Sequence, residues 1–294
     1  PVFTGTGHQA DHHGIFENSR NSRTAEERRG RMYKDDSDFT LKVMTYNIKS
    51  CMNRGRKVDP DSTVESVSLL RPDIIALQEV DVGKKRSGFM DQAEYLAGRL
   101  NMNHHFFPVM ENADEQYGIA LLSVYPVSRL ECCYLPALRS RRPKERRGFM
   151  AARIHTPAGG LNVVNTHLGL NPSDRKVQAE SLFTDAALRS TFENGEALIL
   201  CGDFNCGPRS PVYRKIVMHL NDVQTAVGRK GYPKSTFFSW YPFLRLDHIF
   251  ISDHFNPVNV HVPGSGRARS ASDHLPVFAK LAVNNHAALE KKAV

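Results

Sequence analysis

The sequence lacks long apolar runs and contains little cysteine or tryptophan. Its longest apolar runs, such as residues 74–77, have the length of a strand, so no membrane-spanning helix is expected. It has five cysteines among 294 residues, and none of them has the spacing of a zinc site. We therefore interpret the cysteines as reduced thiols of a cytoplasmic protein, with association at a membrane surface left open.

The first 38 residues lack a sustained apolar stripe, and they lack the basic-then-apolar order of a secretory signal. They are polar and rich in charge, so we predict an appended arm, either disordered or partly helical. Apolar periodicity begins near Leu41. We therefore expect one domain at residues 39–282, a C-terminal tail at residues 283–294, and a monomeric protein.

The charges do not balance. Lysine and arginine number 39 against 31 aspartates and glutamates, which gives a formal net charge of +8. This excess suits a polyanionic partner such as nucleic acid, an anionic lipid or a small phosphoester. It suits equally a soluble protein whose molecules repel one another, so the charge alone does not choose a partner.

The apolar pattern predicts strands that mix with helices without alternating strictly with them. We expect strands at residues 41–48, 74–80, 104–110, 117–124, 149–154, 161–168, 197–204, 245–252, 258–263 and 274–281. We expect a helix that is capped by Asp61 or Ser62 and ends before Pro72, and further helices at residues 91–100, 174–192 and 210–220. This order favours an α+β fold with two packed sheets and helices outside.

Six of the apolar strands end in, or follow directly after, an acid, an amide or an imidazole. These residues are Asn47, Gln78 and Glu79, His167, Asp203 and Asn205, Asp247, and Asp273 and His274. One such case is explained by a turn, because aspartate and asparagine favour turns. Six unrelated turns explain the pattern poorly, so we predict that these side chains converge on one site.

The ordered motifs TYNI, LQEV, NTHL, GDFN, RLDHIFIS and SDHLPV resemble the endonuclease/exonuclease/phosphatase superfamily. The resemblance extends from about residue 41 to residue 281 and looks closest to small bacterial members. It implies a four-layered α/β sandwich, with two mixed β-sheets face to face and flanked by helices. It also implies hydrolysis of a phosphoester with a divalent metal, usually Mg²⁺, with Mn²⁺ or Ca²⁺ as alternatives.

The resemblance also implies roles for the residues at the strand ends. Glu79 matches the family's metal-binding glutamate, Asn47 the amide beside it, and Asp273 a second carboxylate near the metal. Such oxygen ligands suit a hard cation that offsets the charge of a phosphodiester.

The remaining matches concern the reaction. Asp203 is implied against the attacking water and Asn205 against the phosphate. His274 resembles the catalytic histidine and Asp247 its orienting carboxylate, whereas His167 resembles the histidine that contacts phosphate or assists the leaving group. Whether His274 or Asp203 is the base stays open.

The sequence departs from the abasic-site endonucleases, which carry an acid two residues after the asparagine. Lys49 stands at that position here, so we do not expect that activity. The "WTDRIL"-like segment of inositol 5-phosphatases is absent as well. His248 follows Asp247 on a strand and should face the opposite way, so we predict that it packs.

Substrate-binding residues are suggested by position alone. They are Arg147 in the arginine-rich stretch 138–148, Lys84 and Arg86 after Glu79, and Trp240 in the aromatic stretch 235–243. We favour a metal-dependent phosphodiesterase or nuclease acting on nucleic acid. The alternatives are a phosphatase or sphingomyelinase-like phosphodiesterase acting on a lipid or small phosphoester, and an inactive anion-binding module.

Overall fold

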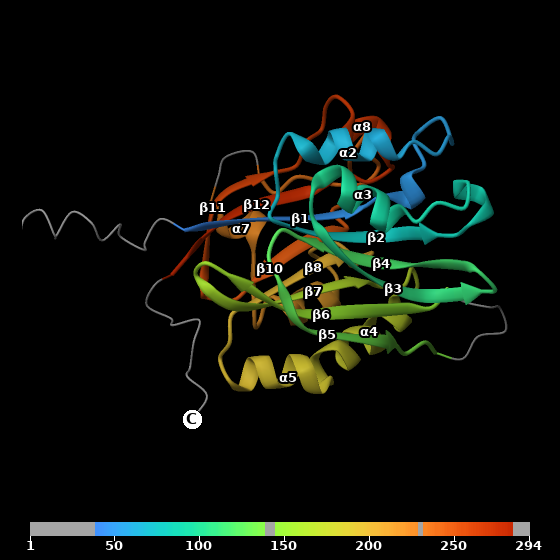
Figure 1. Ribbon diagram of the computed structural model, residues 1–294. Helices are drawn as coiled ribbons and strands as arrows, with labels where there is room; N and C mark the ends of the chain where they lie inside the picture. The colour runs from blue at the N-terminus through green and yellow to red at the C-terminus, as the bar shows by residue number, and fades with distance from the viewer. Residues whose placement is uncertain (1–38, 139–144, 229–231, 285–294) are drawn as a thin grey trace, which may run out of the picture. The chain divides into compact units, whose positions relative to one another are not determined.

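Two six-stranded mixed β-sheets lie face to face, with helices on their outer sides (Figure 1). The computed structural model describes residues 39–138, 145–228 and 232–284. The arm predicted at residues 1–38 and most of the predicted tail therefore lie outside the described residues. The arrangement of the sheets confirms the predicted α+β sandwich.

The first sheet has the strand order β11-β12-β1-β2-β4-β3. Its strands are β1 (Thr40–Asn47), β2 (Ile74–Val82), β3 (Asn103–Asn112), β4 (Glu115–Ser123), β11 (Phe255–His261) and β12 (Val277–Val283). β1 and β2 are parallel, with Asn47 beside Gln78, and the other pairs are antiparallel. The carboxyl ends of β1 and β2 therefore lie at the same edge.

The second sheet has the strand order β5-β6-β7-β8-β10-β9. Its strands are β5 (Val127–Leu135), β6 (Arg147–Thr156), β7 (Gly159–His167), β8 (Leu198–Asp203), β9 (Asn221–Asp222) and β10 (Asp247–Ile251). β7 and β8 are parallel, with His167 beside Asp203, and β10 runs antiparallel to β8 with Asp247 also beside Asp203. Three of the predicted site residues are thus neighbours by strand register alone.

The two central parallel pairs face each other across an apolar core. β1 and β2 contact β7 and β8, and buried aliphatic residues of both sheets, such as Val43, Ala76 and Val163, fill the space between them. Buried polar side chains also join the two sheets, and Gln78 Nε2 donates to Asn165 Oδ1 at 2.8 Å. Asn165 in turn donates to the carbonyls of Leu77 and Ala120. Because these groups are fully buried, the bonds fix one sheet relative to the other close to the strand ends.

Helices cover the outer face of each sheet (Figure 1). Above the first sheet lie α2 (Pro60–Ser68), α3 (Gln92–Leu100) and α8 (Ala268–Ala271), and below the second lie α4 (Pro172–Thr184), α5 (Ala186–Glu193) and α6 (Pro211–Ile216). The short elements are α7 (Val223–Ala226) and the 3₁₀ turns η2 (Lys49–Cys51) and η3 (Lys85–Ser87). Among the described residues, none of the helices has the length and apolar character needed to cross a bilayer.

Three local predictions were wrong. The helix cap expected at Asp61 or Ser62 is instead Asp59, whose side chain accepts from the backbone N–H of Ser62, so the helix begins at Pro60. The single helix expected at residues 174–192 is two helices, since Asp185 has an extended backbone. Strand β5 was not predicted, because it lies at the edge of its sheet and most of its side chains are exposed or half-buried.

Candidate active site

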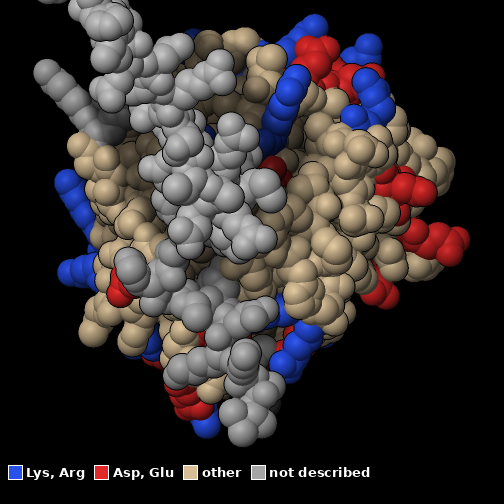
Figure 2. Space-filling model, turned by 60° about the vertical axis from the view of Figure 1, so that its left-hand side comes forward, with Lys and Arg blue, Asp and Glu red and all other residues tan. Residues whose placement is uncertain are grey.

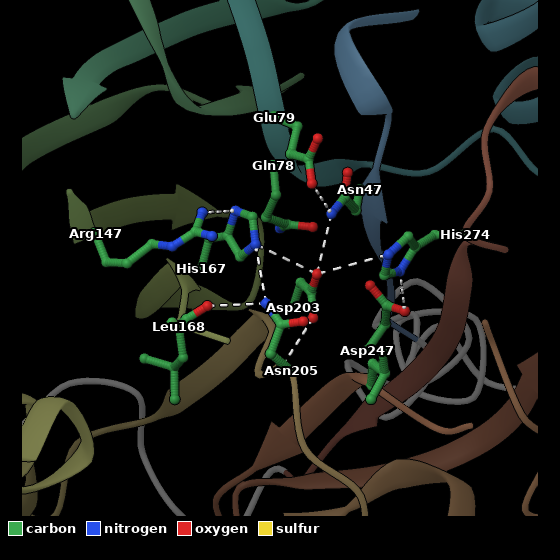
Figure 3. Close-up of polar contacts among 12 residues, drawn as sticks. Asn47, Gln78, Glu79, Arg147, His167, Leu168, Asp203, Asn205, Asp247 and His274 are labelled. Carbon is green, nitrogen blue, oxygen red and sulfur yellow. Dashed lines mark hydrogen bonds and ion pairs between the residues drawn. The ribbon is translucent and has the colours of Figure 1, made fainter. Parts of the chain in front are cut away.

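The polar strand ends meet around the carboxylate of Asp203, which is 1% exposed (Figure 3). Its Oδ2 accepts a hydrogen bond from Nδ2 of Asn47 at 3.0 Å, and its Oδ1 accepts one from the backbone N–H of Asn205 at 2.8 Å. Nε2 of His167 lies 3.4 Å from Oδ2, and Nε2 of His274 lies 3.8 Å from it. Both sheets therefore contribute to one polar centre, as the sequence predicted.

His274 and Asp247 form a buried pair. Nδ1 of His274 lies 2.8 Å from Oδ2 of Asp247, whose side chain is fully buried. Burial alone would lower the pKa of His274, but the carboxylates of Asp247 and Asp203 raise it to about 10. The ring of Phe237 packs against that of His274, with ring centroids 4.8 Å apart. The imidazole is thus held in place and protonated at neutral pH.

Several of these side chains are positioned by backbone with a positive φ angle. Glu79 has a φ of 56° and sits where the pairing of β2 with β4 shifts register, and Asn205 has a φ of 48°. Such conformations cost free energy for residues with a Cβ, and they concentrate at functional sites. Gly202 supports the same region, because a Cβ there would lie 1.9 Å from the carbonyl oxygen of Thr166. A glycine is required where β7 and β8 approach beside Asp203.

Two carboxylates of the site are buried, which makes their ionised forms unfavourable. Burial raises the pKa of Asp203 to about 6, and the neighbouring Asp247 adds to the effect. Burial also raises the pKa of Glu79, whose Oε1 accepts from Nδ2 of Asn47 at 2.9 Å. Within the described part of the chain, Oδ1 of Asp247 is buried without a hydrogen-bond partner. A hard divalent cation would relieve this excess of negative charge, so the donor set fits such an ion.

Two groups of residues could hold the ion. Ligand atoms of Asp203, Asp247 and His274 lie within 4.8 Å of one another. The predicted group of Glu79, Asn47 and Asp273 is arranged differently, because Glu79 and Asn47 are in contact whereas Asp273 binds the ammonium group of Lys49. Glu79 and Asp273 line the same cleft, and Asn47 borders on it through its contact with Glu79. The carboxylate of Asp273, however, is already paired with the cation of Lys49.

The cleft that contains these residues has a volume of about 860 Å³. Its polar wall includes the cations Lys49, Lys84, Arg86 and Arg147. Its apolar lining residues include Met52, Met110, Leu170, Phe237, Leu244 and Leu246. Figure 2 shows basic and acidic side chains mostly along the margins of one face of the molecule. The cleft therefore brings four cationic side chains close to the buried acids and imidazoles of the polar centre.

Three of the four predicted substrate-binding residues line the cleft, but each already has an acidic partner. Lys84 lies 3.7 Å from Glu115, Arg86 binds Asp81 through two hydrogen bonds, and Arg147 donates to Glu145. Trp240 is not among the lining residues. It stacks on Phe238, with ring centroids 4.7 Å apart, and the guanidinium of Arg54 lies over it.

Sequence reasoning missed the roles of residues that support the site. The turn at Lys49, Ser50 and Cys51 has three successive positive φ angles, and Arg86 and Gln92 hold it by hydrogen bonds to Ser50. No spacing signals such a turn, although Lys49 stood out as a departure from the family pattern. The prediction for His248 was right, because it is buried and hydrogen-bonded to Asp222 and to the carbonyl of Cys206.

The chain is thus an α+β sandwich in which acids, amides and histidines gather where strands end. The chain belongs to the endonuclease/exonuclease/phosphatase family, whose model matches residues 44–274. Members of this family are metal-dependent phosphoesterases.

The individual relatives described next share between 22% and 28% sequence identity with this chain. The chain is 28% identical over 257 residues to the Escherichia coli (strain K12) protein named "Uncharacterized protein YbhP", which covers 83% of this chain and 96% of that one. An endonuclease/exonuclease/phosphatase structure from Beutenbergia cavernae is similar with a TM-score of 0.66 and 22% identity, covering 83% of this chain and 72% of that one. The human Nocturnin catalytic domain, solved with bound sulfate, has a TM-score of 0.66 and 23% identity over 83% and 94% of the two chains. The structural likenesses establish the fold.

The pKa of His274 predicts how stability depends on pH without metal. Its pKa is raised from 6.5 to about 10, so its stabilising contribution is complete below pH 6.5 and is lost as the pH rises through about 10. We expect the free energy of unfolding, measured with urea in EDTA, to fall more between these pH values for the wild type than for His274→Gln. Equal losses in the two proteins would contradict the raised pKa.

Proposed function

We propose that the protein is a divalent-metal-dependent phosphodiesterase that cleaves nucleic acid by attack of water on phosphorus. The observation that carries the proposal is the convergence of Asp203, Asn205, His167 and the His274–Asp247 pair in one cleft lined by cations. Buried acids beside a protonated imidazole suit a reaction in which a water loses a proton while negative charge builds on a phosphate.

Asp203 is the proposed base. Its pKa of about 6 leaves it ionised at neutral pH yet more basic than an ordinary aspartate. His274 is the proposed stabiliser of charge, because its raised pKa keeps it protonated and unable to accept a proton from water. The sequence left open whether Asp203 or His274 is the base, and we propose Asp203.

Glu79 and Asn47 are the proposed holders of the metal, which supplies a positive charge against the phosphate and the leaving oxygen when bound. Asn47 would present its amide oxygen after rotation about the last side-chain bond, since its nitrogen now faces Glu79 and Asp203. Asp273 is proposed as a second carboxylate near the metal. In the structure, its carboxylate pairs with the ammonium group of Lys49.

The substrate is proposed from the lining of the cleft. Lys49, Lys84 and Arg86 line it, each beside an acidic partner, and cations in a cleft suit the repeated phosphates of DNA or RNA. A lipid or small phosphoester is the second candidate, because Leu170 is 73% exposed and Leu244 is 42% exposed on the same cleft. Exposed apolar side chains at a site suit an amphiphilic substrate or a membrane surface.

A substrate panel with Mg²⁺, with Mn²⁺ and with EDTA tests the proposal. We expect wild type to cleave single-stranded or plasmid DNA or RNA with Mg²⁺, and we expect EDTA and Asp203→Ala to abolish cleavage. Turnover of sphingomyelin or phosphoinositide with little nicking would favour the second candidate. Binding of all these anions without turnover would show an inactive anion-binding module instead.

A further inference from the structure

Arg147 is a largely buried arginine that lines the cleft and contacts His167. It begins strand β6, it is 5% exposed, and the next residue, Gly148, pairs directly with His167 of β7. Its Nη1 contacts Nδ1 of His167 at 2.9 Å (Figure 3). The same nitrogen lies 2.8 Å from Oε1 of Glu145. Nη1 carries two hydrogens, so it can donate one to each of these acceptors.

The contact with Arg147 determines where the proton of His167 lies. A guanidinium has donors only and does not lose its proton in proteins, so Nδ1 of His167 must accept. In a neutral imidazole, one nitrogen accepts while the other carries the hydrogen. The hydrogen of His167 is therefore on Nε2, the atom that faces Asp203.

We propose that Arg147 is a positioning residue that holds His167 as the neutral Nε2–H tautomer, so that His167 donates a hydrogen bond into the cleft without transferring a proton. The part of this inference that names a phosphate oxygen as the acceptor rests on the proposed function. The tautomer itself does not, because it follows from the contact between Arg147 and Nδ1.

The surroundings of His167 support a neutral ring. Burial lowers its pKa well below the usual value, and the positive charge of Arg147 lowers it further. The other charged groups that face it are Asp203 on β8, which lies 3.4 Å away, and the imidazolium of His274. An acid that assists the leaving group would need the protonated ring, which two nearby cations disfavour.

A second donor lies beside Nε2. Nδ2 of Asn205 is 3.2 Å from it and donates to the carbonyl of Leu168 at 2.9 Å, which leaves its other hydrogen available. Two N–H groups next to each other make a good partner for an anionic oxygen and a poor partner for each other. In this geometry, His167 and Asn205 can both donate hydrogen bonds to the substrate phosphate.

Nitrogen-15 NMR of the imidazoles in the wild-type protein tests the tautomer directly. The signals of His167 are assigned by their loss in His167→Gln. We expect the Nε2–H tautomer at about neutral pH, and an Nδ1–H tautomer or a protonated ring would overturn the proposal. This measurement needs no activity and no change at Arg147, so it stands even if the proposed function fails.

Replacement of Arg147 tests whether it acts through His167. We expect Arg147→Met to release the fixed tautomer and to lower kcat about ten- to a hundredfold, the range seen when partners that orient a histidine are removed. The matched control is Arg153→Met on the same strand, whose arginine pairs with Glu196 at 2.8 Å outside the cleft and should change neither readout.

A double-variant comparison separates positioning from a general structural role. In the His167→Gln background, we expect Arg147→Met to cause no further fall in kcat, because its effect passes through the missing ring. A fall as large as in the wild-type background would overturn the proposal. Circular dichroism spectra and melting temperatures confirm that the proteins compared are folded.

Discussion

Asp203→Asn is expected to lower kcat by about a thousandfold, within the range for loss of a positioned acid or base. Asparagine keeps the shape of the side chain, and its single amide oxygen can still accept from the backbone N–H of Asn205, whereas its NH2 group would then face Nδ2 of Asn47, so one of the two hydrogen bonds is lost. It cannot take a proton from water, and it removes the negative charge that His274 faces at 3.8 Å. Steady-state kinetics on the substrate identified by the panel measures the effect.

Stability distinguishes loss of chemistry from loss of fold. Because burial raises the pKa of Asp203, its ionised form is unfavourable in the metal-free protein. We therefore expect Asp203→Asn to unfold at the same or a higher temperature than the wild type in EDTA. Asp253→Asn, an exposed aspartate that accepts from Asn221, is the control and should leave kcat unchanged. An Asp203→Asn protein with more than about a tenth of wild-type kcat would remove Asp203 from the role of base.

The layers and the polar centre were predictable because they depend on strand registers that the sequence reveals. His167, Asp203 and Asp247 each end or begin an apolar strand, and parallel or adjacent strands bring such ends together. Alternation of apolar residues indicates which side faces the other sheet, so the opposite orientation of His248 could also be predicted.

The supporting contacts were not predictable, because they depend on backbone that no pattern signals. Three left-handed residues in η2 carry Lys49 to Asp273, which turns a predicted metal ligand into the partner of a lysine. Arg147 likewise reads as a phosphate-binding residue in the sequence, since its burial behind His167 depends on where β6 starts. Charge spacing reports that a cation is near a site, but only packing decides what it contacts.

Asp247→Asn is expected to lower kcat by about a thousand- to ten-thousandfold, because it changes the tautomer of its histidine partner as well as its charge. The carboxylate now accepts from Nδ1 of His274 at 2.8 Å and raises the pKa of the ring. An asparagine can instead donate its N–H to Nδ1, which places the hydrogen of a neutral ring on Nε2. The imidazolium that faces Asp203 would no longer be present at neutral pH, and NMR of the His274 nitrogens would report the change.

The same variant decides which group of residues holds the metal. If Glu79 and Asn47 hold the ion, Asp247→Asn should bind Mn²⁺ as the wild type does, whereas Glu79→Gln should bind it at least about tenfold more weakly. If Asp203, Asp247 and His274 hold it, the order of the two variants is reversed. Titration with Mn²⁺ followed by electron paramagnetic resonance measures both affinities without any turnover. A loss of affinity in Asp247→Asn alone would show that the ion lies against the imidazole pair, and the proton would then have to leave the attacking water by a route other than Asp203.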